Sequence, residues 1–279
     1  FGNPAALALA ASTLQDDAAL LDRLDASRDS YRAALVIRPR AVPPPGAAGA
    51  SLAALTGGEA SSYHPGEHGD VFVLRRALDW GGLPLETGQV ITVDVVDTAR
   101  YHRDLGLLLR PVHDNLLGWD TVGLPAPEPA LGMSREAFVD YLRGASPSPV
   151  PEPEVTWGSP ALARVAVANR TAQGSAIAST ANWVELQFTG TEVLDVQLGE
   201  FSGAEYLRQE GGAMRRTVAR DATAVRLFLT YVPPRARVSG GAVRFLAPPR
   251  SLATRWGVRL GDGSEASGGL QPVPLAKGR

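Results

Sequence analysis

Cysteine is absent from the 279 residues of this chain, and lysine occurs only once, at Lys277. Without cysteine there can be no disulfide, no thiolate ligand for a metal and no thiol nucleophile. The chain also lacks a block of like charge, because 27 basic residues stand against 29 acidic ones, giving a net charge of −2. We therefore expect no specific nucleic-acid site and no electrostatic attraction to an anionic membrane.

Long apolar runs are missing too, since none approaches the roughly 18 residues needed to cross a bilayer. No membrane span is expected for this reason. Hydrophobic residues make up 44% and charged residues 20%, proportions typical of a folded globular protein. A chain of this length can form one large or two medium domains with buried cores.

The second half of the chain has the alternation of half-buried β-strands. Val184, Leu186 and Phe188 alternate with polar or amphipathic neighbours, so they are expected to share one buried face. Six segments show such a pattern: 163–169, 182–188, 192–198, 223–232, 241–247 and 254–260. Strands at this spacing predict an antiparallel β-sandwich of jelly-roll or immunoglobulin-like type over residues 156–262.

The first half, residues 1–146, is predicted to be a β-rich α+β domain with a few short helices. A capping box at 12–15, followed by leucines at helical spacing, predicts an N-terminal helix. Ser134 is predicted to cap a second short helix, with Met133 and Phe138 placed for a hydrophobic staple. Segments rich in β-branched residues predict strands over 31–38, 70–80 and 88–99.

Two segments are predicted to be extended chain without helices or sheet strands. Residues 147–155 carry a proline at every second position from 147 to 153, which predicts an extended linker and a domain boundary. Residues 263–279 are rich in Gly, Ser and Pro and are expected to form an extended C-terminal arm. The fold class is therefore mainly β, with two domains.

The stretch "RYHRDLGLLLRPVHDN" (100–115) contains His-Arg-Asp-Leu, with which a protein-kinase catalytic loop begins. That loop needs an Asn five residues after the Asp, and this position is Leu109. The chain also has no Gly-rich phosphate loop, no Asp-Phe-Gly and no lysine on a predicted strand. The kinase interpretation fails.

The same stretch also fits part of an iron-binding facial triad, which needs two His and one carboxylate. His102 and Asp104 would share one face of a strand over 102–110, and His113 follows. The triad's third ligand usually comes from a distant strand, so the ordinary strand is favoured. Its buried face would carry Leu105, Leu107 and Leu109, and its other face His102, Asp104 and Arg110.

"YHPGEHGD" (63–70) contributes two further histidines, His64 and His68. Two His four residues apart bind zinc together when a helix places both rings on one face, and Pro65 and Gly66 disfavour a helix here. We expect a solvated loop before the strand at 71. A metal site built from His64, His68, His102, Asp104 and His113 is the alternative.

No residues fit nucleophilic or acid–base catalysis. The Gly-x-Ser-x-Gly elbow is absent, and Asp94 and Asp97 would face opposite sides of one strand. We therefore expect no catalytic residues, no cofactor and no enzymatic activity.

Residues 147–155 and 263–279 bury too little apolar surface to offset an ordering cost of ~1–2 kcal/mol per residue. They are therefore expected to lie on neighbouring chains. This favours a structural subunit of a large assembly, such as a viral or phage-like capsid or particle protein, in a virion or an extracellular surface layer. Its partners would be copies of itself or other subunits of that assembly. Two alternatives stay open: an extracellular β-sandwich module that binds a carbohydrate or a protein, and a metal-dependent enzyme using the histidines.

Overall fold

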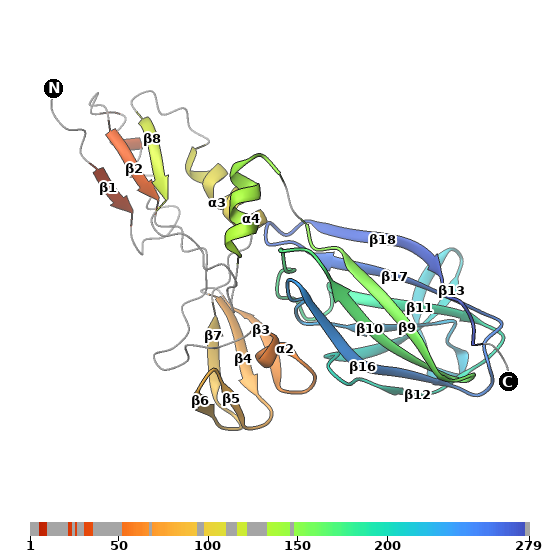
Figure 1. Ribbon diagram of the computed structural model, residues 1–279. Helices are drawn as coiled ribbons and strands as arrows, with labels where there is room; N and C mark the ends of the chain where they lie inside the picture. Colours follow the sequence, from red (N-terminus) through yellow and green to blue (C-terminus); the bar gives the residue numbers. More distant parts are fainter. Residues whose placement is uncertain are drawn as a thin grey trace.

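The structure is a computed structural model, and it describes residues 6–9, 22–23, 26, 31–35, 52–66, 69–93, 98–109, 116–121, 133–145 and 148–276. Within these residues the protein is mainly β, and most of its strands pair antiparallel (Figure 1). The predicted helix after residue 12 falls almost wholly outside the described residues.

The described residues of the N-terminal part form eight strands and three helices. They are β1 (Ala6–Leu9), β2 (Tyr31–Leu35), α2 (Leu52–Thr56), β3 (Ser61–Gly66), β4 (Gly69–Leu74), β5 (Leu78–Trp80), β6 (Leu83–Leu85), β7 (Val90–Val93), α3 (Thr98–Leu109), β8 (Leu116–Thr121) and α4 (Arg135–Leu142).

The C-terminal part is built from ten strands and one short 3-10 helix. They are β9 (Pro151–Ser159), β10 (Leu162–Asn169), β11 (Trp183–Thr189), β12 (Val193–Gln197), β13 (Gly203–Glu210), β14 (Ala213–Arg216), η1 (Ala219–Asp221), β15 (Ala224–Phe228), β16 (Ala236–Phe245), β17 (Ser251–Arg259) and β18 (Glu265–Pro272). All six strands predicted for this region are present.

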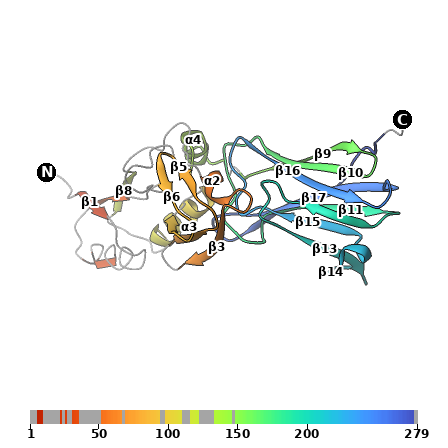
Figure 2. The ribbon, with the colours of Figure 1, turned by 90° about the horizontal axis from the view of Figure 1, so that it is seen from below.

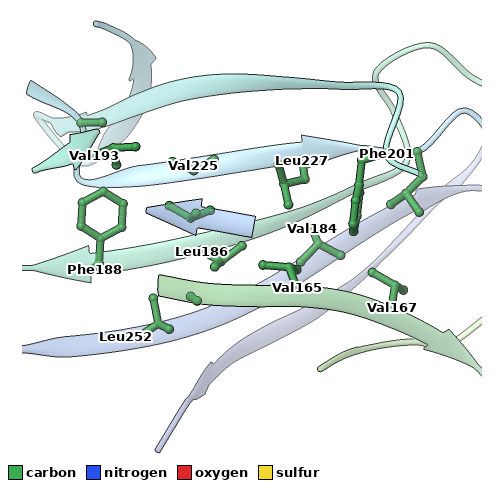
Figure 3. Packing of buried hydrophobic residues seen from close by; sticks show 14 of the residues in the cluster. Val165, Val167, Val184, Leu186, Phe188, Val193, Phe201, Val225, Leu227 and Leu252 are labelled. Atoms are coloured by element: carbon green, nitrogen blue, oxygen red, sulfur yellow. The ribbon is translucent and has the colours of Figure 1, made fainter. Parts of the chain in front are cut away.

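The ten C-terminal strands form two antiparallel sheets, of order β12-β16-β10-β9 and β14-β13-β15-β11-β17-β18. Figure 2 shows the two sheets as separate layers. One core cluster lies between them, with Val165 from β10 and Val243 from β16 on one side. Val184, Leu186 and Phe188 of β11 face them from the other sheet (Figure 3). Period-two alternation therefore correctly predicted which side of β11 is buried.

The N-terminal part combines three small sheets. β1, β2 and β8 pair in parallel, β3, β4 and β7 pair antiparallel, and β5 and β6 form a hairpin. The parallel sheet was not predicted from the sequence, whereas a strand within 88–99 was, and β7 is that strand. Ile91 and Val93 are buried and Thr92 between them is exposed, as the alternation indicates.

The N-terminal part shares a hydrophobic cluster with loops of the C-terminal part. Leu52, Phe72 and Trp80 pack in one cluster with Ile177 and Tyr231. Two hydrogen bonds join the same regions: the Thr98 hydroxyl donates to Gln173 Oε1 at 3.0 Å, and the Gly58 amide donates to the Glu200 carbonyl at 2.8 Å. The described parts on the two sides of the proline segment are therefore packed together.

Helix α4 has the predicted N-cap. The hydroxyl of Ser134 accepts a hydrogen bond from the Ala137 amide at 3.1 Å, which satisfies one of the free donors of the first turn. Met133 and Phe138 are both buried, as a staple across the cap requires.

The strand predicted over 102–110 is wrong, because this segment belongs to the helix α3. Thr98, Tyr101 and Leu105 are buried while His102 and Arg103 are exposed, which is the three-to-four residue period of a helix. The alternating leucines at 105, 107 and 109 suggested a period of two, and the helical period was overlooked.

The loop predicted at 63–70 is also wrong. Its described residues form β3 and the start of β4, with Pro65 paired to Asp70. β3 lies at the edge of its sheet, and an edge strand tolerates a proline because one side of its backbone needs no partner.

Most described residues of the predicted C-terminal arm belong to a strand of the same chain. Residues 265–272 form β18, which pairs antiparallel with β17. Beyond it, the Val273 amide donates to the Leu252 carbonyl at 2.8 Å, and Trp157 Nε1 donates to the Pro274 carbonyl at 2.8 Å. β9 begins at Pro151, so residues 151–155 of the segment predicted to be a linker are part of a sheet.

Candidate functional site

The outer face of the sheet β12-β16-β10-β9 contains a hollow of about 470 Å³. We call it the arginine hollow. Its side-chain lining consists mainly of Glu154, Thr156, Arg164, Gln197, Arg237, Ser239 and Arg244, and its floor of Ala166, Gly240, Gly241 and Ala242.

Strand register brings these residues together from four strands. Arg164 on β10 lies beside Thr156 on β9 and Ala242 on β16, and Ala242 in turn pairs with Gln197 on β12. Because side chains alternate along a strand, Arg164 and Arg244 point outward while Val165 and Val243 enter the core. Small residues between the arginines leave the open volume.

The charges of the arginine hollow are unbalanced. Arg237 is paired with Glu154, with Nε to Oε2 at 2.9 Å. Arg164 and Arg244 are exposed and have no ion-pair or hydrogen-bond partner among the described residues. Three arginines and one glutamate line the hollow, so its formal charge is 3 − 1 = +2. Two acidic residues flank this lining: Asp195 is opposite Arg244 in the register of β12 and β16, and Glu200 accepts a hydrogen bond from Ser239. The excess positive charge is therefore confined to the residues that line the hollow.

The uncharged polar side chains of the hollow differ in whether they can hydrogen-bond to a ligand. The Ser239 hydroxyl donates to Glu200 Oε2 at 3.0 Å and is thereby fixed. Thr156 and Gln197 are exposed and make no side-chain hydrogen bond within the described part of the chain. The hollow therefore offers two unpaired guanidinium groups, one amide and one hydroxyl that can bind an external ligand.

A glycine lets Arg164 take its position. A Cβ added to Gly158 would come within 3.1 Å of Arg164 Nε and 3.0 Å of Leu162 Cδ2. The Arg164 side chain thus lies against the backbone of β9 at a place where a larger residue would displace it.

The outer face of the other sheet carries charges of both signs that satisfy one another. Glu185 is fully buried and accepts hydrogen bonds from Arg226 Nη2 at 2.6 Å and Arg255 Nε at 2.7 Å. Arg226 and Arg216 also bind Glu205, at 3.2 and 2.7 Å. We call these five residues the charge ladder. Each charge in it has an opposite partner, so it has no guanidinium left for a ligand.

Burial alone would raise the pKa of Glu185, which is the largest single influence on that carboxyl. Hydrogen bonds from Arg255, Gln187 and Arg226 act together in the other direction, and the pKa of Glu185 lies below its usual value. The carboxyl is therefore ionised at neutral pH and holds two guanidinium groups in place.

The candidate ligands of the alternative metal site lie on different elements where the structure describes them. His64 is exposed on β3, and His102 is exposed on α3, where Nδ1 lies 3.0 Å from the Tyr141 hydroxyl. Asp104 is on the same helix, and His68 and His113 lie outside the described residues. Among the residues that the structure describes, no three His, Asp or Glu side chains gather closely enough to hold a metal ion.

The arginine hollow was missed by sequence analysis. Arg164 and Arg244 lie in strands that were predicted correctly, and the alternation within each strand places them on its outward face. The pairing of β10 with β16 joins residues that are 67 to 82 positions apart in the sequence, and the sequence pattern alone does not reveal that pairing.

Comparison with known proteins gives no family: no family model matches the chain, and no curated protein or solved structure is significantly similar to it. In the described part of the chain, no helix is both long and apolar enough to cross a membrane.

Proposed function

We propose that the protein is a non-enzymatic binding module that holds an external ligand on the outer face of the sheet β12-β16-β10-β9. The observation that carries this proposal is the arginine hollow, with two arginines that make no ion pair among the described residues. Guanidinium groups beside a carboxylate usually form ion pairs, as they do throughout the charge ladder of the other sheet. Arg164 is opposite Ala242 and Thr156, neither of them acidic, and Arg244 is opposite Asp195 but forms no ion pair with it. Both guanidinium groups can therefore take a partner from outside.

The proposal includes the finer fold assignment: two domains, of which the second is a β-sandwich of the jelly-roll or immunoglobulin-like class. Two features support it. The sheets face each other across one core, and the chain changes sheet at each step from β10 to β13. Such crossing is typical of Greek-key sandwiches, which commonly serve as binding domains.

The test is a binding screen of the full chain against soluble neutral and acidic polysaccharides and a soluble acidic polypeptide. We expect at least one probe to bind, and Thr156→Trp to weaken that binding because the indole fills the exposed rim of the hollow. Arg215→Ala is the control, since Arg215 is exposed on β14 of the other sheet. A ligand whose affinity responds to Arg215→Ala and not to Thr156→Trp would contradict the proposal.

A structural subunit of a larger assembly is the second candidate, and the outer edge of β18, which pairs with no other strand in the described part of the chain, favours it. β18 has eight residues, lies at the end of the six-stranded sheet and exposes Leu270. From Ala266 to Gln271 it contains no charged residue and no proline. Edge strands usually carry such residues because they oppose pairing with another chain. A neighbouring subunit of a virion-like particle or surface layer could add a strand at this edge.

Native mass tests this second candidate. Light scattering of the purified full chain should give a multimer that Leu270→Lys converts to a monomer, because a charge on an edge strand opposes pairing. A monomer at all concentrations would refute the candidate. A multimer unaffected by Leu270→Lys would refute the role of β18.

A further inference from the structure

We infer that the ligand of the arginine hollow is an acidic saccharide whose carboxylate groups are bound by Arg164 and Arg244. This inference rests on the proposed binding function and adds the chemical class of the ligand.

The position of the hollow on a sheet face favours a saccharide over a peptide. Backbone amides and carbonyls of β10 and β16 are engaged with neighbouring strands, so they are not available to the main chain of a peptide. Extended peptides are usually bound by the free backbone groups of a sheet edge. A ligand in the hollow must be recognised by side chains, and Gln197 and Thr156 can donate to and accept from sugar hydroxyls.

The composition of the lining favours an acidic sugar over a neutral one. No aromatic side chain lines the hollow, so it has no flat apolar surface on which a sugar ring could stack. Arginine presents donors in a rigid fork that matches the two oxygens of a carboxylate. With Arg164 and Arg244 on adjacent strands, two acidic groups of one polymer, or two oxygens of one group, can be held.

The local charge predicts how binding depends on salt. The hollow has a formal charge of +2 and its arginines are exposed, so attraction to a polyanion is screened as ionic strength rises. Affinity should therefore fall with added salt, and by less in a variant that lacks the two free arginines.

The experiment is calorimetric titration of the full chain with polygalacturonate, dextran sulfate, neutral dextran and polyglutamate. We expect polygalacturonate to bind, and Arg164→Ala and Arg244→Ala each to weaken binding about tenfold, as the loss of one charged hydrogen bond implies. Arg215→Ala removes the same charge elsewhere and should leave the affinity unchanged. Melting curves of each variant show that the chain is folded.

Four outcomes would overturn the inference. Binding of dextran sulfate without polygalacturonate would reject the carboxylate, and equal binding of polyglutamate would reject the saccharide. Binding of dextran that Thr156→Trp abolishes and Arg164→Ala leaves intact would reject the acidic ligand while the proposed function stands. Binding of none of the four probes would reject the inference together with the proposed function.

Discussion

Replacement of Glu185 by glutamine should lower the free energy of unfolding by about 3 kcal/mol. Removing one partner of a buried ion pair typically costs about 3–5 kcal/mol, because the remaining charge stays buried without compensation. Two features place the expected cost of Glu185→Gln at the lower end of this range. The side chains of Arg226 and Arg255 are 21% and 32% exposed, and Arg226 keeps its bond to Glu205.

Urea unfolding of the full chain at neutral pH, followed by circular dichroism, measures this effect. Glu152→Gln is the matched control, because it makes the same chemical change at an exposed pair with Arg170, 3.0 Å apart. The two side chains of that pair are 47% and 75% exposed, so the control should cost less than about 1 kcal/mol. Equal destabilisation by the two variants would refute the argument that burial decides the strength of the charge ladder.

The pH dependence gives an independent check. The pKa of Glu185 is lowered in the folded protein, so its carboxylate stabilises the fold fully above the unfolded-state pKa of about 4.3. That contribution is lost as pH falls from there through the lower folded-state pKa. The stability difference between the wild type and Glu185→Gln should therefore be constant near neutral pH and shrink below about pH 4. A difference that grows on acidification would refute the sign of the shift.

Three further predictions concern packing and metal. Phe188→Ala should cost about 3–5 kcal/mol in the same urea assay, because the ring is buried and packs 5.0 Å from that of Phe245. Gly257→Ala should shift tryptophan fluorescence, because the new Cβ would lie 2.6 Å from the Trp183 ring and displace it. Elemental analysis of purified protein should find no stoichiometric iron, zinc or copper; one metal per chain, lost on His102→Ala, would contradict this.

The C-terminal strands were predictable because their signal is local. In β11 every second residue from Val184 to Phe188 is apolar, and this alternation specifies both the strand and its buried face. β18 has no such signal, because Gly268 and Gly269 interrupt it and most of its residues are exposed. β18 is a strand because it pairs with β17. That pairing is a tertiary contact and cannot be read from the pattern of residues within 265–272.

The segment 98–109 shows how two periods can coexist in one sequence. Leucines at alternate positions suggest a strand, while Thr98, Tyr101 and Leu105 repeat at helical spacing. Tertiary packing decides between them, because the ring of Tyr101 lies against those of Phe138 and Tyr141 on α4. The partner helix was itself predictable from its cap, and the contact between the two helices was not.

The candidate site was unpredictable for a related reason. Arg164 and Arg244 are ordinary outward residues of their own strands, and an exposed arginine usually has no functional meaning. Their significance comes from adjacency across β10 and β16, and from the lack of an ion pair to either arginine among the described residues, although Asp195 is opposite Arg244. In the other sheet, Glu185 points outward from β11 and is opposite Arg226 on β15 and Arg255 on β17. Its carboxylate forms ion pairs with both arginines.

The C-terminal segment connects the two sheets and bears on both candidate functions. β18 extends the six-stranded sheet, and the next residues reach the other sheet through the bond between Trp157 and the Pro274 carbonyl. Trp157 precedes Gly158 and follows Thr156, so this bond anchors β9 at the rim of the arginine hollow. The described residues of the tail up to Pro274 are thus hydrogen-bonded within their own chain. The proposed assembly would use the outer edge of β18, whereas ligand binding would use a rim that the same segment holds.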